Sequence, residues 1–242
     1  MRKTRNFKKG FDIIFDLKNT EKYPKLHVRK LGRIAALYQE SASQKNLFYL
    51  DSSKSYVKKA LDLVQKMNFP KAKASLYNEY GFLIYRYDNK KKAGYQYYLK
   101  SANLYLQLKD TNNYVIPMIH VLEYYNDMRY FKQSDSLISV LYGITKSKKW
   151  FTTKIDLYST IAGKFKDQGD SLAFCKWKIK EKALIIKYLQ VSYTKQMNLF
   201  KVIHENEKFK TKAKSSNLLA KKRKLELEVE TAQIKKMFIY LS

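Results

Sequence analysis

The chain has 242 residues, of which 45% are hydrophobic, and it contains only seven glycines and three prolines. This length can bury a core in one large domain or two small ones, and so few turn residues exclude a β-sandwich or β-barrel with its many tight turns. The composition therefore predicts an all-α fold.

The formal net charge is +28, from 49 Lys and Arg residues against 21 Asp and Glu residues. Such an excess suits an anionic partner, namely nucleic acid, an anionic membrane surface or an acidic peptide. However, 42 of the 49 are lysines, and they are spread along the chain with abundant Asn, Tyr, Ile and Phe, a bias also expected of an AT-rich genome. Proteins that recognise phosphates or bases depend more on Arg than on Lys, because the planar guanidinium can donate two parallel hydrogen bonds. The charge therefore leaves a functional and a compositional explanation open.

Clusters of turn-forming residues divide the chain at regular intervals, near 40 residues apart within each of two interleaved sets. The segments between them are long enough for helices of three or four turns. The first set lies at 19–24, 68–71, 109–113 and 145–149, and the second at 41–46, 88–91, 126–127 and 166–170. The two sets together predict four successive helical hairpins.

Within these segments the apolar residues recur at helical spacing. Two stripes illustrate this: Leu76, Tyr77, Tyr80, Gly81, Ile84 and Tyr85, then Ala93, Tyr97, Ser101, Leu104 and Leu108. We therefore interpret Tyr77, Tyr80 and Tyr97 as hairpin core, with Gly81 and Ala93 at the helix crossing. Tyr85, Arg86 and Tyr87 remain as candidates for contact with a partner.

Small and aromatic residues at fixed offsets carry a family resemblance. In first helices the pairs are Leu31-Gly32 with Ala35, Tyr80-Gly81 with Ile84, and Val121-Leu122 with Tyr125; in second helices they are Ala93 with Tyr97, Ser134 with Ile138, and Ala173 with Trp177. The chain resembles tetratricopeptide-repeat (TPR) proteins, whose helix pairs cross closely at small residues. Lys100 and Lys180 depart from the pattern because a second alanine is usual there. The resemblance implies an α-solenoid of about four degenerate TPR-like hairpins.

From about residue 170 onward the chain has no Gly or Pro, which predicts a long C-terminal helix. We divide the chain into a repeat domain, 1–190, and a charged connector helix, 191–242. Leu218, Lys222, Leu225, Val229, Ala232 and Ile239 fall roughly on a heptad seam, so self-association through a coiled coil is a weakly specified prediction. The last six residues, MFIYLS, are too few to span a bilayer, which needs ~20, and would be the truncated start of a transmembrane segment.

This layout is similar to the TPR sensor region of bacterial signalling proteins common in Bacteroidetes, in which repeats lead into a membrane span and then a histidine kinase or a helix-turn-helix regulator. The resemblance implies a non-catalytic, protein- or peptide-binding scaffold in signal transduction, and a chain that is part of a longer protein. The alternatives are a basic solenoid that binds nucleic acid or anionic membrane, and a freestanding repeat protein. Asp12 and Asp16 interrupt the N-terminal apolar run, so we expect no secretory signal. Localisation stays open between cytoplasm and membrane association.

Residues suited to catalysis are scarce. His27, His120 and His204 lack neighbours at metal-ligand spacing, and no nucleotide-binding or nucleophile motif occurs. We expect no catalytic residue, metal or cofactor in this chain, although a kinase module could follow its C-terminus. Cys175, among apolar residues, is predicted to be a buried thiol.

The binding site implied by the resemblance is the concave face of the first helices of the hairpins. An extended peptide would contact Arg and Asn groups through its carboxylate or backbone and aromatic residues through its side chains. The candidate positions are Arg29, Arg33, Asn78, Phe82, Tyr85, Arg86, Glu123 and Asn126. The alternative for each is an ordinary solvated or half-buried helix residue.

Overall fold

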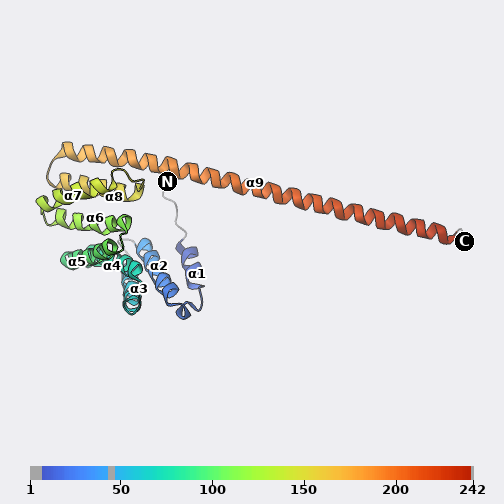
Figure 1. The fold of residues 1–242 in the computed structure, drawn as a ribbon, viewed down its shortest axis with the longest axis horizontal. Helices are drawn as coiled ribbons and strands as arrows, with labels where there is room; N and C mark the ends of the chain where they lie inside the picture. The colour runs from blue at the N-terminus through green and yellow to red at the C-terminus, as the bar shows by residue number, and fades with distance from the viewer. Residues whose placement is uncertain (1–6, 43–46, 241–242) are drawn as a thin grey trace. The chain divides into compact units, whose positions relative to one another are not determined.

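Helices follow one another along the chain in a computed structural model, which describes residues 7–42 and 47–240 (Figure 1). No strand occurs in these ranges, which confirms the all-α prediction. The elements are α1 (Phe7–Phe15), the 3-10 helix η1 (Thr20–Lys22), α2 (Pro24–Ser41), α3 (Leu47–Gln65), α4 (Pro70–Arg86), α5 (Lys91–Gln107), α6 (Thr111–Asp127), α7 (Phe131–Thr145), α8 (Phe151–Asp167) and α9 (Ser171–Tyr240). Helices α2 to α9 form four successive hairpins, so the predicted α-solenoid is confirmed.

Several turns between helices contain one residue in the left-handed backbone conformation, and in most of them this residue is not glycine. Asn89, Lys109 and Arg129 have φ of 52°, 54° and 58°, and Gly169 has 76°. The next residue's amide often donates to a carbonyl five positions back, as from Asp110 to Tyr105 and from Tyr130 to Tyr125, the bond of a Schellman motif. This motif satisfies the last helical carbonyls, which explains how a chain poor in glycine still ends its helices sharply.

Contacts divide the chain into two compact units, residues 1–184 and 185–242, and α9 contributes to both. In the first unit three apolar clusters succeed one another. One joins α2, α3 and α4 around Val57 and Leu83, the next joins α4, α5 and α6 around Tyr98, and the last joins α6, α7 and α8 around Leu141 and Leu157. Each cluster therefore links a hairpin to its neighbour, as expected of a solenoid.

Helices α4 and α5 cross at two glycines. A Cβ added at Gly94 would lie 2.7 Å from the Tyr85 Cβ and 2.9 Å from the Gly81 carbonyl oxygen. The small residue at the crossing is thus Gly94 and not the predicted Ala93, and the fully buried aromatic residue of α5 is Tyr98 and not Tyr97. The prediction was wrong by one residue because both positions pair a small residue with a tyrosine four places later.

Within the second unit, α9 continues as a helix to Tyr240. Leu218 and Leu225 of the predicted heptad seam are exposed, while the side chains of Val229, Ala232, Ile239 and the final MFIYLS lie outside the described part. Among the residues that the structure describes, no helix has a stretch both long and apolar enough to cross a bilayer.

Candidate functional site

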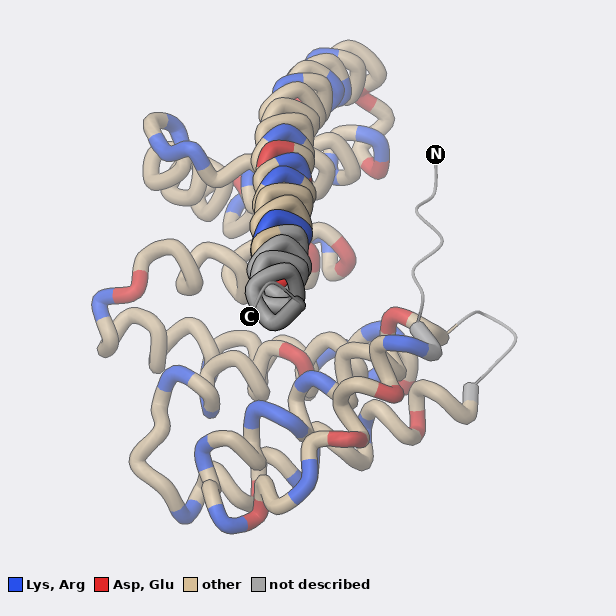
Figure 2. Tube along the Cα trace, turned by 90° about the vertical axis from the view of Figure 1, so that its right-hand side faces the viewer, with Lys and Arg blue, Asp and Glu red and all other residues tan. Residues whose placement is uncertain are grey.

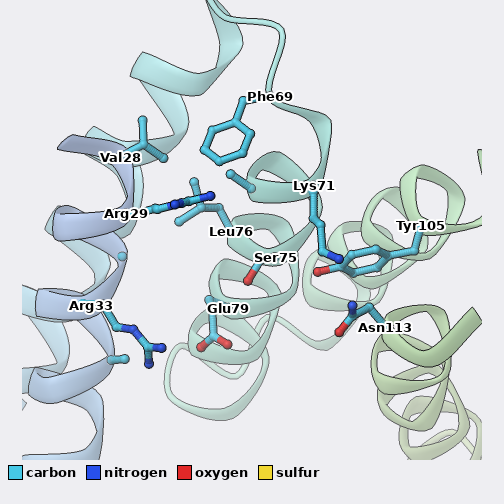
Figure 3. A pocket seen from close by; sticks show the side chains of 13 residues that line it. Val28, Arg29, Arg33, Phe69, Lys71, Ser75, Leu76, Glu79, Tyr105 and Asn113 are labelled. Atoms are coloured by element: carbon cyan, nitrogen blue, oxygen red, sulfur yellow. The ribbon is translucent and has the colours of Figure 1, made fainter. Parts of the chain in front are cut away.

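The first helices of the hairpins form the walls of an open cavity of about 560 Å³ (Figure 3). One wall is α2, which contributes Val28, Arg29 and Arg33, and the facing wall is α4, which contributes Leu76 and Glu79. Lys71 and Phe69, at the start of α4, and Tyr105 and Asn113, from α5 and α6, complete the lining. Its volume is within the usual range for ligand pockets, roughly 300–1,000 Å³.

Cationic side chains and aromatic rings contribute to the chemistry of this cavity. The Arg29 guanidinium lies 5.4 Å from the centroid of the Phe69 ring, a cation–π distance. Lys71 pairs with Asp110 at 2.7 Å, and this contact, with the Asn113 side chain, lowers the pKa of the Asp110 carboxyl. Arg33 has no hydrogen bond or ion pair to any described residue. Its guanidinium is therefore available to an incoming group.

Glu79 is the acidic group of the cavity, and its carboxylate points into the space between α2 and α4 (Figure 3). Burial raises the pKa of the Glu79 carboxyl, and His120 opposes the shift in part. No ion pair or hydrogen bond within the described residues compensates the carboxylate, so its ionised form is disfavoured. The cavity thus offers a ligand the cationic Arg33 and a carboxyl group that burial shifts toward its neutral form.

A smaller hollow of about 260 Å³ adjoins this cavity between α1 and α2. Ile13 and Ile14 supply its apolar side, and Arg33 and Ala36 line both hollows. Gly32 also lines the main cavity, where a Cβ would meet only the Leu76 Cδ2 at 3.7 Å. The absence of a side chain at Gly32 therefore widens the cavity.

Farther along the same row of helices, α4, α6 and α8 enclose a second hollow of about 240 Å³. Arg86 forms an ion pair with Glu123 there, and the His120 Nδ1 lies 3.6 Å from the Glu123 Oε2. The His120 ring stacks on Tyr98 at a centroid distance of 4.7 Å. Burial also raises the pKa of the Asp156 carboxyl in this hollow.

The structure separates the predicted site residues into four pairs. Arg29 and Arg33 line the main cavity, and Arg86 and Glu123 line the second hollow and neutralise each other. Phe82 is half-buried with its ring 5.8 Å from His120, and the Asn78 Oδ1 is buried with no hydrogen-bond partner among the described residues. Tyr85 and Asn126 form the fourth pair, which is buried.

Tyr85 and Asn126 hold helices together. The Tyr85 hydroxyl donates to Asp127 at 2.7 Å, and burial raises the pKa of Tyr85. The Asn126 Nδ2 donates to the Thr160 carbonyl at 3.2 Å, and its Oδ1 accepts from Ser134 at 2.6 Å. These contacts join α4 to α6, and α6 to α7 and α8, so both side chains contribute to packing between helices.

Sequence reasoning missed Phe69, Lys71, Glu79 and Tyr105, which reach the main cavity from three different segments. No local pattern brings these positions together, because the cavity depends on how α4 lies against α2. Cys175 was also misplaced, since it is exposed. Trp177, two residues later, lies on the opposite side of α9 and packs against Tyr158 instead.

Lysine and tyrosine side chains gather on another surface, made by α3, α4 and α5. A hollow of about 370 Å³ there is lined by Lys58, Tyr77, Tyr80, Tyr97 and Lys100, with the Lys100 Nζ 4.9 Å from the Tyr97 ring centroid. Elsewhere, Lys and Arg residues recur over the hairpins and along α9 (Figure 2). In the described part of the chain, His, Cys, Asp and Glu side chains form no cluster of three that could hold a metal ion.

Fold and cavity together define an α-solenoid of helical hairpins with an open groove. No family model and no curated protein matches the chain. Among solved structures, the chain is similar to the crystal structure of BtubC (BKLC) from P. vanneervenii, with a TM-score of 0.55 and 13% sequence identity, covering 76% of this chain and 75% of that one. At this identity the similarity shows the fold alone.

Proposed function

We propose that the chain is a non-catalytic scaffold that binds a peptide or protein segment in the cavity between α2 and α4. The observation that carries the proposal is the open cavity lined by Arg29, Arg33 and Phe69, in which Arg33 lacks a partner within the described chain. A guanidinium can donate two hydrogen bonds to a carboxylate, and Phe69 and Leu76 can cover apolar side chains. The resemblance to TPR proteins supports the same use of this face.

A peptide library selected against the purified protein tests the proposal. Enriched peptides should bind, and Arg33→Ala should weaken them by about 10-fold or more, the usual loss when a charged hydrogen bond is removed. Gly32→Leu should weaken them further because its side chain enters the cavity. Fluorescence anisotropy measures each affinity. Lys132→Ala, at an exposed lysine of α7, is the control that leaves binding unchanged. Peptide binding that survives both cavity variants would contradict the assignment.

The resemblance to Bacteroidetes sensor regions supports a finer proposal, that the scaffold belongs to a membrane-associated signal-transduction protein and transmits binding through α9. Its test is the coding sequence downstream of Ser242. An apolar span followed by kinase or DNA-binding motifs is expected, and an immediate stop codon would favour a freestanding repeat protein.

The Lys–Tyr surface on α3, α4 and α5 favours a second candidate function, the binding of nucleic acid. Tyrosine rings can stack on bases while lysines neutralise phosphates. Affinity for single-stranded DNA or RNA should then fall steeply between low and physiological salt, because bound phosphates release counterions. Tyr97→Ala should reduce this affinity and Tyr23→Ala, an exposed tyrosine elsewhere, should not. Failure to bind at low salt removes this candidate.

A further inference from the structure

Glu79 differs from the other partly buried acidic residues in having no cationic partner. Among the described Asp and Glu residues that are not exposed, it is the one whose carboxylate forms no ion pair. The others pair as Asp88 with Lys54, Asp110 with Lys71, Glu123 with Arg86 and Glu181 with Lys178. The chain has 49 Lys and Arg residues against 21 Asp and Glu residues. A shortage of cations therefore does not explain why Glu79 is unpaired.

The cationic residues that line the main cavity leave the Glu79 carboxylate without a partner. Arg29 lies over the Phe69 ring at 5.4 Å, and Lys71 already has an ion-pair partner. Arg33 projects from α2 and Glu79 from α4 into the space between the two helices (Figure 3), yet the two form no ion pair. The cavity of about 560 Å³ thus has a guanidinium on one wall and a carboxylate on the other, with room for a ligand between them.

An unpaired carboxylate at this position is costly to the free protein. Burial raises the pKa of the Glu79 carboxyl, because loss of water disfavours the ionised form. A cationic group placed beside the carboxylate favours the ionised form and offsets part of that cost. Since no described residue supplies such a group, a ligand that carries one gains affinity from Glu79.

The net charge of the chain gives this carboxylate a role in selectivity. A chain with a charge of +28 attracts anions of every kind, so attraction alone does not distinguish among them. A carboxylate on the cavity wall disfavours a ligand with negative charge only and favours one that also carries a positive charge. We propose that Glu79 is the subsite for a cationic nitrogen group of the bound peptide, an ammonium or a guanidinium, opposite an anionic group held by Arg33. The inference rests on the proposed peptide-binding function and adds the charge pattern of the peptide.

A hexapeptide library, screened against the whole chain, supplies the probes. Peptides that bind should carry both a negative and a positive group. Each is then remade with one cationic group neutralised at similar size: a lysine as acetyl-lysine, an arginine as citrulline, or the N-terminal amine as its acetamide. Neutralising the group that Glu79 binds should weaken binding by about 10-fold or more, the usual loss when a charged hydrogen bond is removed. The three forms show which source supplies the cationic group.

Glu79→Gln is the decisive variant, because glutamine keeps the shape of the side chain but cannot ionise. It should bind the charged and the neutralised peptides equally well, since each change removes the same interaction. Asp156→Asn is the matched control. Asp156 also has a raised pKa and no ion pair to a described residue, but it lines the second hollow. This control should keep the full preference for the charged peptide, and circular dichroism checks that both variants keep their helix content.

Two kinds of failure can be told apart. Peptides that bind the wild type equally well with and without their cationic groups would overturn the inference and leave the proposed function intact. So would a preference for the charged peptide that is undiminished in Glu79→Gln, or one that Glu79→Gln and Asp156→Asn reduce equally. A chain that binds no hexapeptide contradicts the proposed function itself, and the inference with it.

Discussion

At the residue scale, Gly94 and Gly81 set how closely α4 and α5 approach. Gly94→Ala should destabilise the fold by about 1–3 kcal/mol because the new Cβ overlaps Tyr85 and the Gly81 carbonyl. Gly143→Ala is the control: it lies within α7, where a Cβ meets nothing within 4 Å, and should stabilise by about 0.5–1 kcal/mol through helix propensity. Urea unfolding measures both. A Gly94→Ala protein as stable as the wild type would show that α4 and α5 leave room for a methyl group at this crossing.

Glu79 predicts a pH dependence of stability. Its folded-state pKa is raised by burial, so the carboxyl contributes stability below its ordinary pKa near 4.5, and this contribution is lost as the pH rises through the raised value. Glu79→Gln cannot ionise. The stability of the variant relative to wild type should therefore rise as the pH rises above the ordinary glutamate pKa near 4.5, measured as the difference of the two unfolding free energies. A difference independent of pH would mean that Glu79 is well solvated.

The sequence alone does not show which of the predicted site residues line a cavity and which are buried. Arg29 and Arg33, predicted on the groove face as positions four apart on one helix, line the same cavity in the structure. Tyr85 and Asn126 share the same type of position but are buried, because neighbouring hairpins cover them. Which of the equivalent helix positions stays open depends on contacts between repeats.

At the element scale, large side chains fix the fourth hairpin. The Trp177 ring of α9 meets Tyr142 at 5.9 Å and Tyr158 at 5.3 Å, both edge-on. Trp177→Ala should cost about 3 kcal/mol by the lost packing, at the lower end for a buried tryptophan because the ring is only half-buried. Leu172→Ala, 83% exposed at the start of α9, should change stability by no more than about 0.5 kcal/mol. Urea unfolding compares the two variants. It is monitored by the circular dichroism of the helices, because this signal does not depend on the tryptophan that is replaced. Similar losses would indicate a general effect of shortening side chains on α9.

The positions of the turns could be predicted from the local sequence. Eight turn clusters were predicted from residue type. Seven of them lie at or next to a break between helices, and most of the cluster at 41–46 lies outside the described residues. The cluster at Asn126-Asp127 is displaced to 128–130, since buried Asn126 still belongs to α6 and the left-handed residue is Arg129. Residue type locates a turn, but the last turn of helix is set by what its side chains pack against.

At the scale of the whole molecule, the apolar clusters predict that residues 1–184 fold without the rest of the chain. The three clusters and the residues packed on them lie between Val28 and Trp177. A chain ended at Leu184 should keep the thermal midpoint of the repeat unit within a few degrees, because a solenoid is stabilised by contacts between neighbouring repeats. Scanning calorimetry of the shortened and full chains makes the comparison. A broad, non-cooperative transition after shortening would show that the repeats need residues 185–242.

The sequence by itself determined the all-α class, the hairpin order and the long final helix, because these follow from helical periodicity, scarce glycine and proline, and the spacing of turn residues. Tertiary structure decided which residues share a cavity and which are buried. Glu79, Phe69 and Tyr105 line one cavity with Arg29 and Arg33 only because α4 lies against α2, and one residue of helical register distinguishes buried Tyr98 from partly exposed Tyr97. Periodicity is a property of single helices, whereas cavities and exposure arise from the distances between helices, which small residues such as Gly94 set.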